Sequence, residues 1–149
     1  MRRIRPISNI IAVSLLAGYT IFLMIIWRKI PGIIPVHFNF AGEADSYGKK
    51  ISLIVEPILG WMILGAIIFI ERFPGAINFP VEVTDANRSK LYMLAFEMMA
   101  VIKIMTVFIL GYAGLLSIFN SMPIWPIYAI FGIMFGTIII SIIRMIRAK

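Results

Sequence analysis

The chain has 149 residues, of which 61% are hydrophobic and only 14% are charged, and its mean hydropathy is +0.98. A soluble globular domain is roughly half apolar and about a quarter charged, so this composition excludes an ordinary soluble fold. It also excludes a disordered chain, which is poor in apolar residues. The net charge of +7 comes from Lys and Arg in small scattered groups, so we expect no direct binding of nucleic acid.

Four apolar segments are long enough to cross a membrane, which requires about 20 residues. They are apolar on all sides, which predicts helices and not the alternating strands of a β-barrel. We therefore predict an all-α membrane protein with one polytopic domain, residues 1–149. The predicted helices cover residues 7–27, 51–70, 88–119 and 123–146, and the main loops cover residues 28–50 and 71–87.

The distribution of Lys and Arg predicts the orientation, because cytoplasmic loops of membrane proteins carry an excess of these residues. Nine lie at the termini and around loop 71–87, whereas four lie in loop 28–50. We predict that both termini and loop 71–87 are cytoplasmic and that loop 28–50 lies outside. The nine are Arg2, Arg3, Arg5, Arg72, Arg88, Lys90, Arg144, Arg147 and Lys149.

Three charged residues fall inside predicted helices, where charge is costly and often functional. Glu56 is close to the start of the second helix, and we expect it near the outer surface. Glu97 and Lys103 are six positions apart in the third helix and are not a natural i,i+4 pair. We favour the interpretation that both lie at the cytoplasmic interface. The alternative is a path for protons or ions.

Small residues predict where the helices approach one another. Gly132 and Gly136 form a G-x-x-x-G pattern in the fourth helix. We favour packing within this bundle. The alternative is a seam between two copies of the chain, so a homodimer stays open.

The outer loop, residues 28–50, carries the most informative polar residues. Its prolines and glycines predict a fixed path, with turns at Gly42 and Gly48. An extended run would place His37 and Asn39 on one side and their apolar neighbours on the other. Two interpretations follow: a hydrogen-bonded cap over the helix ends in which His37 pairs with Asp45, or a divalent metal site. A lone histidine favours the cap. The candidate metal ligands are His37, Glu43 and Asp45.

The inner loop, residues 71–87, leads into the third helix. Thr84 is a candidate N-cap, and Asn87 stands three positions later, where a capping box usually has Glu or Gln. Asn78 is not explained by this start signal, and we expect it to tie the loop to the second helix.

Both loops resemble a bacterial membrane family known as domain of unknown function 1648, which includes the SdpI-type toxin-immunity proteins. The resemblance covers about residues 20 to 110. Its outer-loop part is similar to the family's Pro-x-His-x-Asn, Gly-x-x-Asp and Gly-x-Lys signature, with Lys49 directly after the last glycine; the residues that carry it are Pro35, His37, Asn39, Gly42, Asp45, Gly48 and Lys49. Its inner part is carried by Asn78, Pro80, Val81, Thr84, Asn87 and Tyr92, and Lys103 matches a lysine in the following helix.

The resemblance implies a polytopic protein of the bacterial cytoplasmic membrane. The best-understood role in the family is immunity to a secreted peptide toxin, coupled to sequestration of a transcriptional repressor at the membrane. We therefore expect a non-catalytic sensor or binder of an extracytoplasmic peptide or envelope component. A cytoplasmic regulator is a second expected partner, the lipid bilayer surrounds the helices, and no cofactor is expected.

Two other functions remain as alternatives. One is a metal-dependent membrane enzyme that uses the His and acidic residues of the outer loop. The other is a small transporter component in which Glu97 or Lys103 faces a water-filled path. In the favoured interpretation His37, Asn39, Asp45 and Lys49 carry recognition or hold its geometry.

Overall fold

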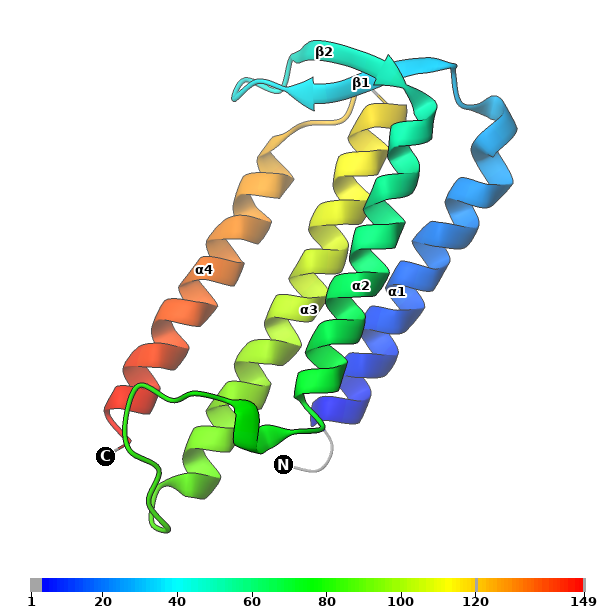
Figure 1. Ribbon diagram of the computed structural model, residues 1–149. Helices are drawn as coiled ribbons and strands as arrows, with labels where there is room; N and C mark the ends of the chain where they lie inside the picture. Colours follow the sequence, from blue (N-terminus) through cyan, green and yellow to red (C-terminus); the bar gives the residue numbers. More distant parts are fainter. Residues whose placement is uncertain (1–3, 120, 149) are drawn as a thin grey trace.

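The computed structural model describes residues 4–119 and 121–148, so the predictions for Arg2, Arg3 and Lys149 fall outside the described residues. Four helices lie side by side, and a β-hairpin lies across one end of the bundle (Figure 1). The helices are α1 (Ile4–Ile26), α2 (Val55–Ile70), α3 (Arg88–Ile118) and α4 (Trp125–Ile146). Each is long and apolar enough to cross a membrane, α2 together with the 3₁₀ turn that precedes it. This confirms the four predicted helices.

The outer loop forms an antiparallel hairpin of β1 (Ile33–Phe38) and β2 (Ala44–Lys49). The all-α prediction did not include this hairpin. Gly42 has a φ of +86° at its tip, which confirms the turn expected there. Gly48 forms no turn: it lies inside β2 opposite Ile34, where an added Cβ would come 3.0 Å from the Val36 side chain. The Val36 side chain packs against the backbone at position 48, and this close contact favours glycine there.

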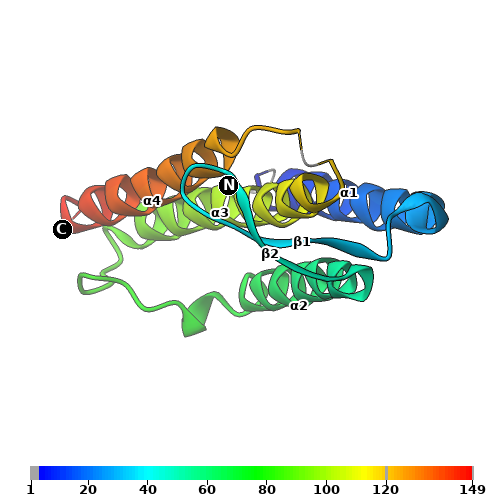
Figure 2. The same ribbon diagram turned by 90° about the horizontal axis from the view of Figure 1, so that it is seen from above.

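The hairpin runs across the helix ends from the side of α1 toward α4 (Figure 2). We call this the hairpin end of the bundle, and the opposite end, where α1 begins and α4 finishes, the terminal end. Lys50 fixes the hairpin to the end of α1, because its Nζ donates hydrogen bonds to the carbonyl oxygens of Trp27 (2.9 Å) and Ile30 (3.1 Å). The ammonium also lies 5.1 Å from the centre of the Trp27 ring.

Three helices share an apolar core in the middle of the bundle. Ala12 and Leu16 of α1, Leu64 of α2 and Val107 of α3 pack together and are at most 4% exposed. The buried residues of α1 and α2 recur every three or four positions, so they lie on one face of each helix: Ser8, Ala12 and Leu16 in α1, and Pro57, Gly60 and Leu64 in α2. Gly60 brings α2 close to α1, since an added Cβ would come 2.8 Å from the Leu16 side chain.

Helix α4 packs against α3 mainly at the terminal end. There Leu91, Leu94 and Ala95 of α3 form a buried cluster with Met145 and Ala148, and the inner loop covers this cluster. The buried residues of α4 are Ser141 and Met145, both in its C-terminal half, whereas Ile124, Ile127 and Tyr128 near its start line a cavity. The candidate site occupies this cavity at the hairpin end.

Gly132 and Gly136 do not pack within the bundle, so the interpretation that we favoured for them is wrong. An added Cβ at either position would meet nothing within 4 Å. Neither faces another helix, because α4 touches α3 with a different side. Close packing instead uses Gly60 and Gly114, which lie on the shared faces of α2 and α3.

The two hydrogen bonds of the predicted capping box are present, but they close a turn before α3: the helix begins at Arg88 with Asn87 as its N-cap, so the prediction of Thr84 as N-cap is wrong. The Asn87 N–H donates to Thr84 Oγ1 (3.3 Å), and the Thr84 N–H donates to Asn87 Oδ1 (2.9 Å). Asn87 Nδ2 also donates to the Glu82 carbonyl (3.0 Å), which fixes the preceding loop. Asn78 is exposed, and its side chain forms no hydrogen bond within residues 4–119 and 121–148, so the expected tie to α2 is wrong.

Candidate functional site

Asn39 organises the tip of the hairpin. Its Oδ1 accepts hydrogen bonds from the backbone N–H groups of Ala41 (2.9 Å) and Glu43 (3.0 Å), and its Nδ2 donates to the Glu43 carboxylate (2.9 Å). A short amide side chain that bonds its own backbone two residues later is a common turn device. Asn39 therefore holds the geometry of the tip, while Gly42 supplies its left-handed turn position.

His37 pairs with Asp45, as the cap interpretation predicted. The distance between His37 Nδ1 and Asp45 Oδ1 is 2.5 Å, and the two side chains are 67% and 44% exposed. Glu43 binds Asn39. In the parts of the chain that the structure describes, no three His, Asp or Glu side chains are grouped closely enough to hold a metal ion. The three residues proposed as metal ligands are thus not gathered into one site.

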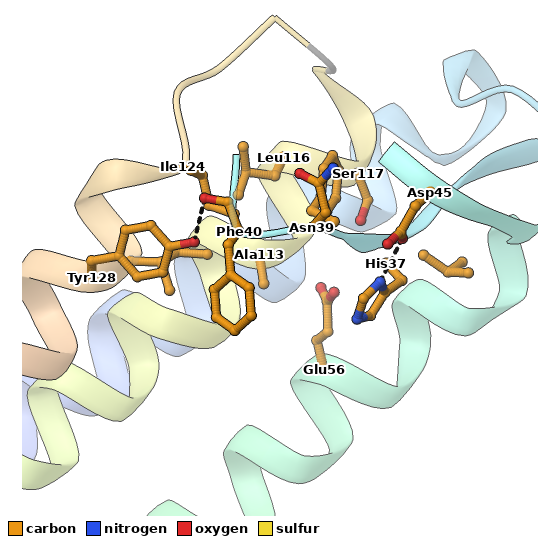
Figure 3. Close-up of a pocket in the computed structure, with 13 residues that line it drawn as sticks. His37, Asn39, Phe40, Asp45, Glu56, Ala113, Leu116, Ser117, Ile124 and Tyr128 are labelled. Atoms are coloured by element: carbon orange, nitrogen blue, oxygen red, sulfur yellow. Dashed lines mark hydrogen bonds and ion pairs between the residues drawn. The ribbon is translucent and has the colours of Figure 1, made fainter. Parts of the chain in front are cut away.

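A cavity of about 510 Å³ lies beneath the hairpin, between the strands and helices α2, α3 and α4 (Figure 3). Glu56 points from α2 toward the hairpin, beside His37, and Asp45 lies above the imidazole. The wall from α3 and α4 is mostly apolar. The polar residues of the lining are His37, Asn39, Asp45, Glu56, Ser117 and Tyr128, and the apolar ones include Phe40, Ala113, Leu116, Ile124 and Ile127.

Glu56 lies in the first turn of α2, at the hairpin end of the helix. The hydroxyl of Tyr19 in α1 donates a hydrogen bond to Glu56 Oε2. Gly114 of α3 leaves room for this pair, because an added Cβ would collide with the hydroxyl and the carboxylate. Three helices thus position the carboxyl group.

Tyr128 links the hairpin to α4. Its hydroxyl donates to the carbonyl of Phe40 at the hairpin tip (2.9 Å), as Figure 3 shows. The Phe40 side chain itself is 94% exposed and borders the cavity. Sequence reasoning missed Tyr19, Ser117 and Tyr128. The available signal was that they are hydroxyl groups near the same end of otherwise apolar helices.

Lys49 does not join this group. Its side chain is exposed and forms no hydrogen bond or ion pair with the described residues, whereas its neighbour Lys50 fixes the hairpin. Pro80 and Asn87 lie at the other end of the molecule, where they line a hollow of about 440 Å³ on the inner loop. The predicted motif residues thus separate into a hairpin group and an inner-loop group.

Lys103 is buried toward the terminal end of the core, so its ammonium group pairs inside the bundle and does not reach the surface. It is only 1% exposed, and its Nζ donates to Glu71 Oε1 (2.7 Å) and to Asn9 Oδ1. Glu71 is equally buried, and its Oε2 has no hydrogen-bond partner among the described residues. Glu97 instead lies at the surface, with its Oε2 3.4 Å from Arg144 Nη1.

Apolar side chains separate the two polar groups. Leu16, Leu64 and Val107 lie between the Tyr19–Glu56 pair and Lys103, and they are at most 4% exposed. Along α1 the order is Asn9, Ala12, Leu16 and Tyr19, each one helical turn from the next. The described residues therefore form no continuous polar path along this core.

Comparison with known proteins finds a family match for the segment that contains the hairpin. Residues 14–60 match the family model described as Domain of unknown function (DUF1648). This match confirms the family resemblance predicted from the outer loop. The DUF1648 segment contains most of α1, the hairpin and the start of α2, and thus Tyr19, His37, Asp45 and Glu56. The part of the cavity wall from α3 and α4 lies beyond it.

One relative with a curated sequence is a protein of Archaeoglobus fulgidus described as "Uncharacterized protein". It is 32% identical over 81 residues, which are 48% of this chain and 42% of the relative. The chain thus spans about two fifths of the length of the curated relative that it matches. No solved structure matches this chain.

Proposed function

We propose that this multi-pass membrane protein is a non-catalytic binder, and that the cavity beneath its hairpin takes up an extracytoplasmic peptide or envelope component. The observation that carries the proposal is the cavity itself, which joins His37, Asn39 and Asp45 of the hairpin with Glu56 of α2. Its volume of about 510 Å³ lies within the range of roughly 300–1,000 Å³ usual for ligand sites. If the bound peptide were a secreted toxin, such binding would provide immunity to it.

The distribution of basic residues supports an outward position of the cavity. Four Lys and Arg lie between residues 28 and 50, against nine at the termini and around the inner loop. By the positive-inside rule, the hairpin end then faces outside. A ligand from outside the cytoplasm reaches the hairpin without crossing the membrane.

Helix α2 offers a connection to a cytoplasmic regulator. It carries Glu56 in the cavity, Glu71 at its C-terminal end, and then the inner loop. A ligand that moves Glu56 would shift α2 as a rigid element and displace that loop. The inner-loop hollow lined by Pro80, Glu82 and Asn87 is where we propose that the regulator binds.

A cavity-filling variant tests the proposed binding. Ala113 of α3 lines the cavity, whereas Ala129 of α4 is exposed outside it. The Ala113→Phe variant should lose a ligand that co-purifies from native membranes with the wild-type protein, because the ring fills the space that the ligand occupies. Native mass spectrometry of both proteins measures this loss as the disappearance of an adduct mass.

The Ala129→Phe variant is the matched control and should retain the adduct. Bound mass that is the same in all three proteins would contradict the proposal, because the ligand would then bind elsewhere. A wild-type protein that carries no adduct, and gains none from an extract of the cell envelope, would contradict it as well.

A further inference from the structure

We infer that the cavity beneath the hairpin is built for an aliphatic ammonium group on an apolar stem, an inference that rests on the proposed function. The first observation is the charge of the lining. It contains two carboxyl groups, those of Asp45 and Glu56, and no Lys or Arg. The one basic side chain is His37, which is already paired with Asp45.

The second observation is an excess of hydrogen-bond acceptors. His37 Nδ1 bonds Asp45, and the Tyr128 hydroxyl donates to a backbone carbonyl, so two of the donors that line the cavity are engaged. Each carboxyl group uses only one oxygen, Oδ1 of Asp45 and Oε2 of Glu56. Asp45 Oδ2 and Glu56 Oε1 accept no hydrogen bond from any described residue.

An ammonium group matches these acceptors, because it has three donors and no acceptor. Hydrogen bonds between an ammonium and a carboxylate are also among the strongest in proteins. Figure 3 shows Asp45 and Glu56 on the same side of the cavity as His37. The cation is therefore expected at this side.

The opposite side of the cavity predicts the rest of the ligand. Ala113 and Leu116 of α3 and Ile124 and Ile127 of α4 supply apolar surface to the cavity. This surface suits a hydrocarbon stem. A zwitterionic phospholipid fits less well, because its phosphate would meet carboxylates without a Lys or Arg to pair with it. The ligand class is thus a cationic amphiphile without an adjacent anion, such as an apolar peptide that presents its amino group.

Three probes of one chain length test the charge preference: octylammonium, octanol and octanoate. The protein is placed in phosphatidylcholine nanodiscs, and binding is measured by calorimetry with the heat from empty nanodiscs subtracted. Octylammonium should bind about tenfold or more tightly than octanol, since a hydrogen bond to a charged group is worth at least that ratio. Octanoate should bind most weakly. Equal binding of the three probes would overturn the inference.

Two variants locate the binding, with a matched control. Glu56→Gln keeps an acceptor for Tyr19, and Asp45→Asn keeps the size of the side chain. Each should weaken octylammonium binding about tenfold. Glu43→Gln changes an acid on the same hairpin that does not line the cavity, and it should leave the affinity unchanged. Equal losses in all three variants, or no loss in the first two, would overturn the inference.

Two further measurements separate this inference from the proposed function. Replacing half of the phosphatidylcholine by phosphatidylethanolamine should leave the octylammonium affinity unchanged, and competition would overturn the exclusion of a zwitterionic lipid. Another outcome is that octanol and octylammonium bind the wild-type protein equally and are both lost in Ala113→Phe. In that case the charge preference is wrong, but the cavity is still a binding site. Octylammonium binding that survives Ala113→Phe would place the ammonium elsewhere.

Discussion

Replacing Lys103 by methionine is expected to lower the free energy of unfolding by about 3–5 kcal/mol, the usual cost of removing one partner of a buried ion pair. The change leaves the Glu71 carboxylate buried without the Lys103 ammonium. It also removes the hydrogen bond that Asn9 Oδ1 accepts from Lys103. Glu71 Oε2 has no hydrogen-bond partner even in the wild type, so no other described donor lies within reach of this carboxylate to replace the lost bond. Titration of a denaturing detergent into mixed micelles measures the change.

A double variant separates the unpaired charge from a loss of packing. Lys103→Met combined with Glu71→Met removes both charges, and it should recover most of the lost stability, because apolar replacement of a buried pair is often neutral. The control is Glu97→Gln, which breaks the exposed contact with Arg144 and should change the stability by less than about 1 kcal/mol. A double variant as unstable as Lys103→Met alone would contradict this account of the core.

The Gly114→Ala variant should destabilise the protein by about 1–3 kcal/mol, the usual cost of overpacking. An added methyl group would occupy the space of the Tyr19 hydroxyl and the Glu56 carboxylate, so their hydrogen bond must break or shift. Because Glu56 also lines the cavity, binding of an ammonium probe should weaken in the same variant. The same titration, followed by calorimetry with octylammonium, measures both effects.

Gly136→Ala provides the comparison, since an added Cβ there meets nothing within 4 Å. It should be as stable as the wild type or slightly more stable, because alanine favours the helix by about 1 kcal/mol over glycine. Equal stability of Gly114→Ala and Gly136→Ala would show that Tyr19 and Glu56 do not depend on this glycine.

The four helices could be predicted from sequence because a span needs only length and apolar composition, and both are local properties. The two hydrogen bonds between Thr84 and Asn87 were equally local and are present, although they close the turn before α3 and Asn87 is the N-cap. The pairing of His37 with Asp45 followed from their proximity in one loop. Each of these features depends on one continuous stretch of the chain.

The errors concern contacts between helices. No partner for Lys103 could be found along α3, yet Glu71, at the end of α2, and Asn9 of α1 reach it. The two glycines of α4 carry a packing pattern, but which face of a helix meets its neighbour is not encoded in that pattern. The cavity was missed for the same reason, since its lining joins the hairpin to three helices.

The most direct test of the central claim, that the hairpin and its cavity face outside, is cysteine labelling in intact cells. The wild-type chain has no cysteine, so single substitutions at exposed positions report one site each. Ser46→Cys in β2 should react with a membrane-impermeant maleimide, whereas Ala86→Cys in the inner loop should react only after the cells are permeabilised. The opposite pattern would place the cavity in the cytoplasm and contradict the proposal of an extracytoplasmic ligand.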